Sequence, residues 1–291
     1  MKLICIAALT LATATAFAEG KESTEYYFQP SAGKQAVQLL YNMDVSPGKI
    51  DTAGTETDAK SEISDFDVNY AYGLNDNNAF GLYTLFGSDK LTVGTTSHTA
   101  TGMGDIHLFY KGFTGMWHYG ADFGFNTAKI KDDATTGIQD NRTTGGISLK
   151  PNVGILMSSG AINYGADLSY VIAMDRQVDD TANTKFSGGG IFRLAPFVEY
   201  NWGMGFVGAE LSYNMVGDTT QKDDTGTNTK LKGESYMNLA LNGSFDFNET
   251  FTGLLTLGMG MHQDHDVSDA STSKMKAYTE TIAALGVRMV F

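Results

Sequence analysis

Long apolar segments are missing from this chain once its first twenty residues are passed. No later stretch approaches the ~18 consecutive apolar residues of a membrane-spanning helix, which excludes a helical membrane protein. Basic residues are scarce too, since 20 Lys and Arg stand against 33 Asp and Glu. The resulting net charge of -13 argues against a nucleic-acid-binding protein, because such proteins present a basic surface to phosphates.

Cysteine and proline are also rare, with 1 Cys and 4 Pro. The single cysteine, Cys5, lies in the opening segment MKLICIAALTLATATAFA, where Lys2 precedes an apolar run and a small-x-small sequence ends at Ala18. This pattern is typical of a secretory signal peptide, residues 1–18, and the exported chain then holds no disulfide. Residues 19–33 are expected to form a periplasmic N-terminal segment, either a short tail or a partial plug, and residues 34–291 a single domain.

Glycine and aromatic residues are abundant, with 34 Gly, 17 Phe and 14 Tyr, which argues against disorder. From residue 33 onward the dominant pattern is an alternation of period two, which predicts strands with two unlike faces. The clearest case is 116–127. One face there carries Trp117, Tyr119, Ala121, Phe123 and Phe125, and the other carries His118, Gly120, Asp122, Gly124 and Asn126.

Twelve segments show this alternation. They lie near 35–45, 62–74, 78–86, 102–113, 116–127, 145–157, 161–173, 188–202, 205–216, 233–247, 251–262 and 276–291. Short turns alternate with long polar connections between them. An even number of long strands with this arrangement predicts an all-β fold, a closed antiparallel transmembrane β-barrel with short periplasmic turns and long extracellular loops. Closure is required because unpaired edge groups cannot be satisfied in hydrocarbon.

The apolar face of each segment is expected to point outward to lipid. Twelve strands about 4.8 Å apart give a ring roughly 24 Å across, which is too wide for a dry core and leaves a lumen of about 10 Å. Aromatic residues beside the short turns, such as Trp117 and Trp202, predict an interfacial belt. Pro151 and Pro196 interrupt two segments on the outward face, where bulges or locally broken pairing are expected.

The chain ends in an aromatic residue that is preceded by apolar residues at alternating positions. These residues are Leu285, Val287, Met289 and Phe291. The pattern resembles the C-terminal signal of Gram-negative outer-membrane β-barrel proteins, and the architecture is similar to a porin. The resemblance implies localisation in the cell outer membrane, insertion by the barrel-assembly machinery, and contact with outer-membrane lipid and lipopolysaccharide. It does not extend to a particular transport or enzyme family.

The inward face carries the charged residues. The predicted pore-lining residues are Asp65, Asp67, Asp105, His107, Lys111, His118, Asp122, Lys150, Asp167, Arg193, Glu199, Glu210, Asp246, Glu280 and Arg288. Acids outnumber bases among them, which predicts a mildly cation-preferring lumen. The alternative is that these charges pair across strands and hold the wall together. Assumed two-residue turns place Lys150 opposite Asp167, and Lys111 opposite His118.

The same assumption places His107 opposite Asp122, and Tyr236 opposite His262. A His oriented by a carboxylate is two thirds of a hydrolytic triad, but no Ser is placed beside His107, and a structural pair is the preferred interpretation. Inward Phe109, Phe197 and Phe206 fill space or form a stacking track for solutes. The sequence indicates no catalytic residue, metal site or cofactor, and the acidic loops lack calcium-loop spacing.

Three functions remain open. The preferred one is a porin-like channel for passive diffusion of small hydrophilic solutes. A structural or adhesive barrel with a blocked lumen and partner-binding acidic loops is the alternative. An outer-membrane hydrolase has the weakest support, since it rests on His107 alone.

Overall fold

The computed structural model describes residues 27–131, 139, 141–179, 184–222, 226, 228–269 and 271–291. The expected signal peptide, residues 1–18, lies outside the described residues, as does the N-terminal segment up to residue 26. Every regular element in the described ranges is a β-strand. No helix within these ranges is long and apolar enough to cross a membrane.

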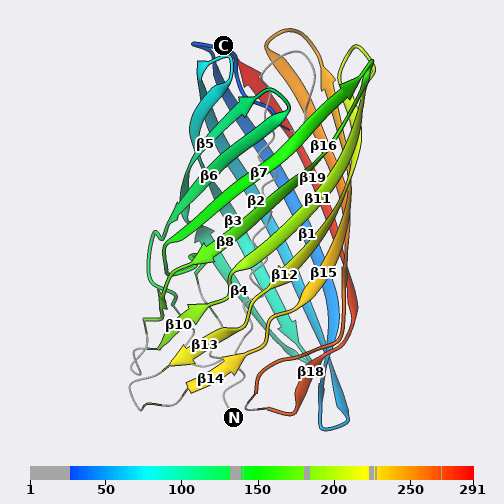
Figure 1. The fold of residues 1–291 in the computed structure, drawn as a ribbon. Helices are drawn as coiled ribbons and strands as arrows, with labels where there is room; N and C mark the ends of the chain where they lie inside the picture. Colours follow the sequence, from blue (N-terminus) through cyan, green and yellow to red (C-terminus); the bar gives the residue numbers. More distant parts are fainter. Residues whose placement is uncertain are drawn as a thin grey trace.

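Twelve strands of the described chain form a closed antiparallel barrel (Figure 1). The first, β1 (Gln35–Thr52), pairs with the last, β19 (Tyr278–Val290), and this pair closes the ring. The other strands, in ring order, are β2 (Thr55–Asn75), β3 (Asn78–Val93), β5 (Ile106–Thr114), β6 (Trp117–Phe125), β7 (Ser148–Ser159), β8 (Ile162–Ala173), β11 (Ile191–Asn201), β12 (Phe206–Val216), β15 (Ser235–Asp246) and β16 (Phe251–His262). The predicted fold and all twelve predicted strands are confirmed.

The first three strands extend well beyond the predicted segments. β1, β2 and β3 contain 18, 21 and 16 residues, and β1 and β2 meet in a tight hairpin at Ala53 and Gly54, whose φ angles are 52° and 84°. In these extensions both faces are polar, so the alternation that reveals the rest of the barrel is absent there. A short strand, β4 (Thr96–Met103), continues the extension by pairing with β3.

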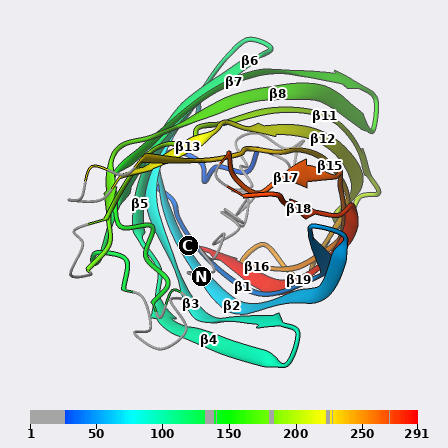
Figure 2. The same cartoon turned by 90° about the horizontal axis from the view of Figure 1, so that it is seen from below.

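The two ends of the barrel differ. The end that carries the short turns, such as 75–78 and 159–162, also carries Gln35 and Phe291, and we call it the short-turn end. At the opposite, long-loop end, the polar connections contain further strands. A four-stranded sheet is made of β9 (Arg176–Gln177), β10 (Lys185–Gly188), β13 (Thr219–Lys222) and β14 (Asn228–Leu231). Figure 2 shows β17 (His265–Asp266) and β18 (Ser273–Met275) inside the outline of the ring at this end.

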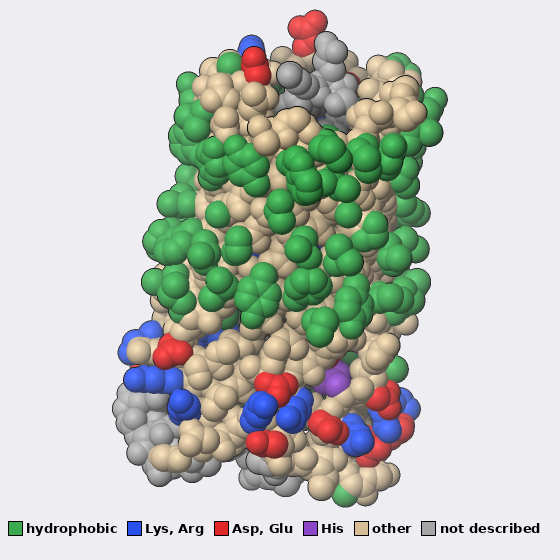
Figure 3. Space-filling model, viewed as in Figure 1, with side chains coloured by type: hydrophobic (Ala, Val, Ile, Leu, Met, Phe, Trp, Pro, Cys, Tyr) green, Lys and Arg blue, Asp and Glu red, His purple; other side chains and the backbone are tan. Residues whose placement is uncertain are grey.

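The outer surface of the barrel is apolar over a broad band. Large hydrophobic side chains such as Leu82, Leu168 and Leu257 point outward and are exposed, and charged side chains gather toward the long-loop end (Figure 3). Trp117 and Trp202 are exposed beside the short turns, where the interfacial belt was expected. Since water does not favour so large an apolar surface, this band is the part of the barrel that meets lipid.

The two prolines inside strands leave gaps in the hydrogen-bond ladder without shifting it. Pro151 keeps its pairing to β6 but is absent from the β7–β8 ladder, which stops at Leu149 and resumes at Asn152 in the same register. Pro196 likewise pairs with β8 and is absent from the β11–β12 ladder. Of the two expected outcomes, locally broken pairing is confirmed, because proline has no N–H to donate.

Candidate functional site

The predicted pore-lining side chains lie on the face of the barrel opposite to the apolar band. Ten of the side chains are buried and four are partly buried, whereas Asp246 is exposed at the end of β15. The buried ones are Asp65, Asp67, Asp105, His118, Asp167, Arg193, Glu199, Glu210, Glu280 and Arg288; the partly buried ones are His107, Lys111, Asp122 and Lys150. The lumen is therefore lined by charged groups of both signs.

The C-terminal residues point the other way. Leu285 and Phe291 are 66% and 53% exposed on the outer face. The Phe291 N–H donates to the carbonyl oxygen of Gln35 at 2.9 Å, and the Gln35 N–H donates to the carbonyl oxygen of Phe291 at 2.8 Å. The backbone of Phe291 thus extends the pairing between the first and last strands, while its ring is exposed on the outer face.

Six successive strands of the ring each contribute one charged side chain of alternating sign to the lumen. We call these residues the alternating charge row; they are Lys111, Asp122, Lys150, Asp167, Arg193 and Glu210, from β5, β6, β7, β8, β11 and β12. Arg193 joins two of them, because its Nη1 lies 3.7 Å from Asp167 Oδ1 and its Nη2 pairs with Glu210 Oε1. Opposite charges on neighbouring strands stabilise the wall, and the pairing interpretation holds for Arg193 and its two carboxylates.

Three of the predicted cross-strand pairs are wrong in register, one in the β7–β8 hairpin and two in the β5–β6 hairpin. Asp122, not Asp167, lies opposite Lys150 in the ladder, and Asp167 lies opposite Gly154. The β7–β8 turn consists of Gly160 and the next residue, with Gly160 at a φ of 62°, instead of the two serines before it. Moving this two-residue turn by two positions moves every partner by four, which preserves the face but changes the neighbour.

A smaller displacement occurs in the β5–β6 hairpin, whose turn lies one position later than assumed, so that every partner moves by two. Its turn contains Gly115, at a φ of 60°, and Lys111 lies opposite Gly120 instead of His118. His107 lies opposite Gly124, so direct opposition to Asp122 is also wrong. The contact itself exists, however, because the two side chains meet diagonally.

Asp122 accepts two hydrogen bonds in the lumen. His107 Nδ1 lies 2.7 Å from Asp122 Oδ1, and the Tyr83 hydroxyl donates to Asp122 Oδ2 at 2.7 Å. The Tyr83 and His107 rings are stacked, with centroids 4.4 Å apart and planes 10° apart. Among the described residues no serine hydroxyl is bonded to His107. The constellation of Tyr83, His107 and Asp122 is a fixed polar element of the wall.

The predicted pairing of Tyr236 with His262 is confirmed, and a third ring joins it. His262 lies between Tyr236 and Tyr278, with centroid distances of 4.5 Å and 4.1 Å and nearly parallel planes. Its Nδ1 lies 3.0 Å from Glu234 Oε2, and its Nε2 lies 3.5 Å from Glu280 Oε2. Both ring faces and both nitrogens are therefore occupied by neighbours.

A loop arginine that sequence reasoning missed also reaches the inner wall. Arg142, between β6 and β7, places Nη2 3.0 Å from Asp65 Oδ2 and 2.9 Å from Asp89 Oδ1. The next two residues bind Asp105, since the Thr143 hydroxyl donates to its Oδ1 and the Thr144 N–H donates to its Oδ2 at 2.9 Å. This loop is thus fastened to Asp65 of β2, to Asp89 of β3 and to Asp105, which directly precedes β5.

The described start of the chain lies inside the barrel. Tyr27, Phe28, Gln29 and Pro30 are buried, and Tyr27 and Phe28 belong to one apolar cluster with inward residues of the wall, including Phe197. The Tyr27 ring lies against His118 with centroids 3.6 Å apart and planes tilted by 36°, and it meets Phe113 and Phe197 edge-to-face at 6.1 Å and 5.3 Å. The Arg288 guanidinium lies 3.7 Å from the centroid of Phe28. The contacts come from β5, β6, β11 and β19, so the segment spans the lumen.

The wall accommodates this segment at one glycine. A Cβ at Gly73 of β2 would overlap the carbonyl oxygens of Pro30 and Ser31. The Gly33 N–H donates to the Gly73 carbonyl oxygen at 2.8 Å, and the Gly73 N–H donates to the Lys34 carbonyl oxygen at 3.0 Å. The position of residues 27–34 is therefore fixed against the short-turn end of β2.

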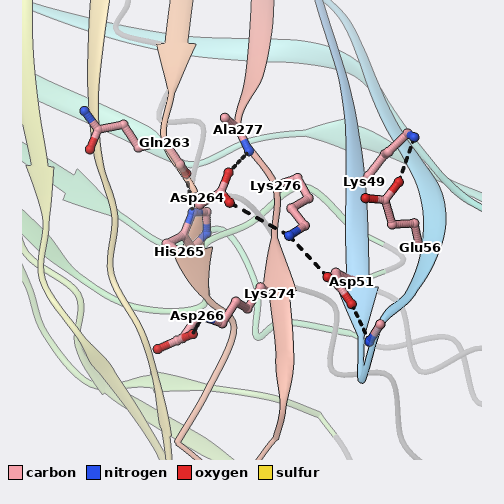
Figure 4. A network of polar contacts seen from close by, with 11 residues as sticks. Lys49, Asp51, Glu56, Gln263, Asp264, His265, Asp266, Lys274, Lys276 and Ala277 are labelled. Carbon is pink, nitrogen blue, oxygen red and sulfur yellow. Dashed lines mark hydrogen bonds and ion pairs between the residues drawn. The ribbon is translucent and has the colours of Figure 1, made fainter.

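Charged side chains at the long-loop end form a network across the barrel seam (Figure 4). Lys276 Nζ lies 3.2 Å from Asp51 Oδ2 and 4.0 Å from Asp264 Oδ2, which connects the β1–β2 hairpin to the β16–β19 connection. Lys49 and Glu56 pair at 2.9 Å across the hairpin itself. Among the described residues no three His, Cys, Asp or Glu side chains are arranged to hold a metal ion.

No family model matches the chain. No curated protein matches it either. Solved structures do: the COG4313 outer membrane channel from Pseudomonas putida F1 aligns with a TM-score of 0.62 and 11% sequence identity, over 89% of this chain and 96% of that chain. The fold is that of an outer-membrane channel.

Two further solved structures align less closely. The CymD monoaromatic hydrocarbon channel gives a TM-score of 0.49 at 9% identity and covers 89% of each chain. A Pseudomonas aeruginosa FadL homologue gives 0.49 at 7% identity and covers 96% of each chain. The predicted resemblance to outer-membrane β-barrel proteins is confirmed at the level of the fold by the alignment with the COG4313 channel.

Proposed function

We propose that this protein is an outer-membrane channel for the passive diffusion of small hydrophilic solutes. The observation that carries the proposal is the opposition of the two barrel faces: the outside is apolar, and the inside is lined by the alternating charge row and further acids such as Asp65 and Glu280. Such a wall offers water and ions a polar route across a lipid-facing barrel.

The lumen is proposed to prefer cations mildly. Acidic side chains on the lumen face still outnumber basic ones after Arg142 is counted, and cross-strand pairing does not change that sum. Asp67 and Glu199 are examples of acids outside the alternating charge row. A lumen with excess negative charge attracts cations and repels anions.

We further propose an orientation and an export route. The short-turn end faces the periplasm and the long-loop end faces outward, as in bacterial outer-membrane barrels. Residues 1–18 direct export and are removed, the barrel-assembly machinery inserts the chain, and outer-membrane lipid and lipopolysaccharide surround it. The segment Tyr27–Pro30 then closes the periplasmic mouth, so solute passage requires it to shift.

Planar-bilayer recording tests the channel. The refolded full chain and the double variant Y27A/F28A are compared under the same salt and voltage. Stepwise currents are expected from both, with a larger open fraction for the variant because the ring contacts that hold the segment are gone. The reversal potential in a salt gradient measures the cation preference separately.

The same buried segment favours a second function, a structural or adhesive barrel with a permanently blocked lumen. Under this alternative neither protein gives stepwise current at any salt concentration or voltage. That result would replace the channel proposal, and deletion of the acidic long-loop-end segments would then be expected to abolish surface binding.

A further inference from the structure

The rings that surround Tyr27 are held by glycines on neighbouring strands. A Cβ at Gly154 of β7 would overlap Nε2 of His118, and a Cβ at Gly165 of β8 would lie 2.9 Å from Phe197 Cε1. The His118 and Phe197 rings therefore lie directly over the glycine backbone, and a residue larger than glycine at either position would displace the ring. The wall backbone, and not only Tyr27, therefore supports the His118 and Phe197 rings.

The arrangement is specific for a flat ring. The His118 ring lies 3.6 Å from the Tyr27 ring at a tilt of 36°, Phe197 meets the Tyr27 ring at 86°, and the Arg288 guanidinium covers the ring of Phe28 at 3.7 Å. Edge-to-face and cation–π contacts depend on the quadrupole of an aromatic ring, which a saturated ring of the same size lacks. We call Phe113, His118, Phe197 and Arg288 the aromatic cage.

We infer that the aromatic cage is a binding site for small aromatic solutes, and that Tyr27 and Phe28 occupy it as built-in ligands. The inference rests on the proposed function, since it names a solute class for the same lumen. The cage side chains come from β5, β6, β11 and β19, so a solute crossing the lumen at this level meets them. A monocyclic phenol reproduces the group that the site already holds.

Free solute must compete with rings that are part of the same chain. A tethered group acts at an effective concentration in the millimolar range, without any loss of translational freedom on binding. The wild-type protein is therefore expected to bind a free phenol weakly, and removal of Tyr27 and Phe28 exposes the cage. Because the cage is held by backbone contacts at Gly154 and Gly165, it keeps its shape in the variant.

Isothermal titration calorimetry of the refolded full chain in detergent tests the inference. The probe is p-cresol, which is the side chain of tyrosine, and the matched control is 4-methylcyclohexanol, which has the same size and hydroxyl group. Y27A/F28A is expected to bind p-cresol about tenfold more tightly than the wild type does, and about tenfold more tightly than it binds 4-methylcyclohexanol. Adding F197A to the double variant is expected to lose most of that preference.

Equal affinity of Y27A/F28A for both probes, or the same weak binding as the wild type, would overturn the inference. The heat-dependent gel mobility of each variant checks that the barrel has refolded, and the single variant Y27A replaces Y27A/F28A if the latter fails this check. The measurement needs no ion flow. If the protein binds p-cresol selectively but gives no current, the channel proposal is refuted and the binding site stands. If it gives current but does not bind p-cresol selectively, only the binding site is refuted.

Discussion

Arg142 forms a buried ion pair with Asp65, with Nη2 and Oδ2 3.0 Å apart, although the two residues lie 77 positions apart in the chain. The arginine comes from a loop at the long-loop end and the aspartate from the inner face of β2. Their side chains are 5% and 0% exposed. The contact therefore fixes the β6–β7 connection to the inner face of β2, a strand that this connection does not adjoin in the chain.

Replacing Arg142 with Ala should destabilise the barrel. The substitution leaves the Asp65 carboxylate buried without its partner, which costs about 3 kcal/mol for pairs of this kind. Urea unfolding of the refolded protein should show a lower midpoint for R142A than for the wild type. The double variant D65N/R142Q is the control, because it removes both charges; it should recover most of the loss, and an equal loss in both proteins would contradict the ion-pair explanation.

Gly73→Ala should displace the N-terminal segment from the lumen. A Cβ at this position overlaps the carbonyl oxygens of Pro30 and Ser31, which belong to backbone and cannot rotate away. The expected result is faster proteolytic cleavage before residue 34 and a larger open fraction in bilayer recordings. Gly243→Ala is the matched control, since a Cβ there comes no closer than 3.9 Å to another atom. Equal protease resistance of G73A and wild type would show that the segment is held elsewhere.

Lys150→Gln should increase the cation preference of the channel. Lys150 lies opposite Asp122 on the lumen face, and its loss makes the lumen more negative by one charge. The reversal potential in a potassium chloride gradient is expected to shift by a few millivolts toward the potassium equilibrium potential. Lys90→Gln changes the same charge on an exposed side chain near the long-loop end and should leave the potential almost unaltered. An identical shift in both variants would contradict a local effect of the lumen.

Acid should loosen the connection between β12 and β15. The Gly233 N–H and the Lys230 ammonium hold the pKa of Asp218 down to about 2. In an unfolded chain an Asp titrates near about 3.9, so the carboxylate stabilises the folded loop above about pH 4 and loses this effect as the pH falls toward about 2. Hydrogen exchange of a peptide that contains Gly233, corrected for intrinsic rates, should show protection falling over that window. D218N should show low protection at every pH.

The strands were predictable from the sequence because their signal is local. A residue on a barrel strand faces lipid or lumen alternately, so each segment carries its own evidence in period two, and the apolar outer face appears even where the ends are uncertain. The polar extensions of β1, β2 and β3 were not predictable in this way. Both of their faces meet water, and the alternation disappears.

The sequence predicted which strand residues of the candidate site face the lumen, but not which residues they contact. The positions of Asp122 and His118 on the lumen face follow from the alternation alone, whereas the residues opposite them depend on a turn that lies one residue later than assumed. Arg142 and Tyr27 carry no strand pattern, and their contacts join residues far apart in the chain. Three adjacent aromatic residues at positions 26–28, in an otherwise polar N-terminal segment, were the available signal for the contacts of Tyr27.

Phe291→Ala should impair assembly in cells without weakening the folded barrel. The ring of Phe291 is 53% exposed on the outer face, and the seam to Gln35 is made by backbone atoms that the substitution leaves in place. The loss of stability is therefore expected to stay below about 2 kcal/mol, the value for burying a side chain of this size. The amount of protein inserted in the outer membrane should fall severalfold, while the urea midpoint of refolded protein changes little. Phe251→Ala, which removes another exposed ring near the short-turn end, should lower insertion much less. If the two variants insert equally well, the terminal ring is not the residue that the assembly machinery recognises.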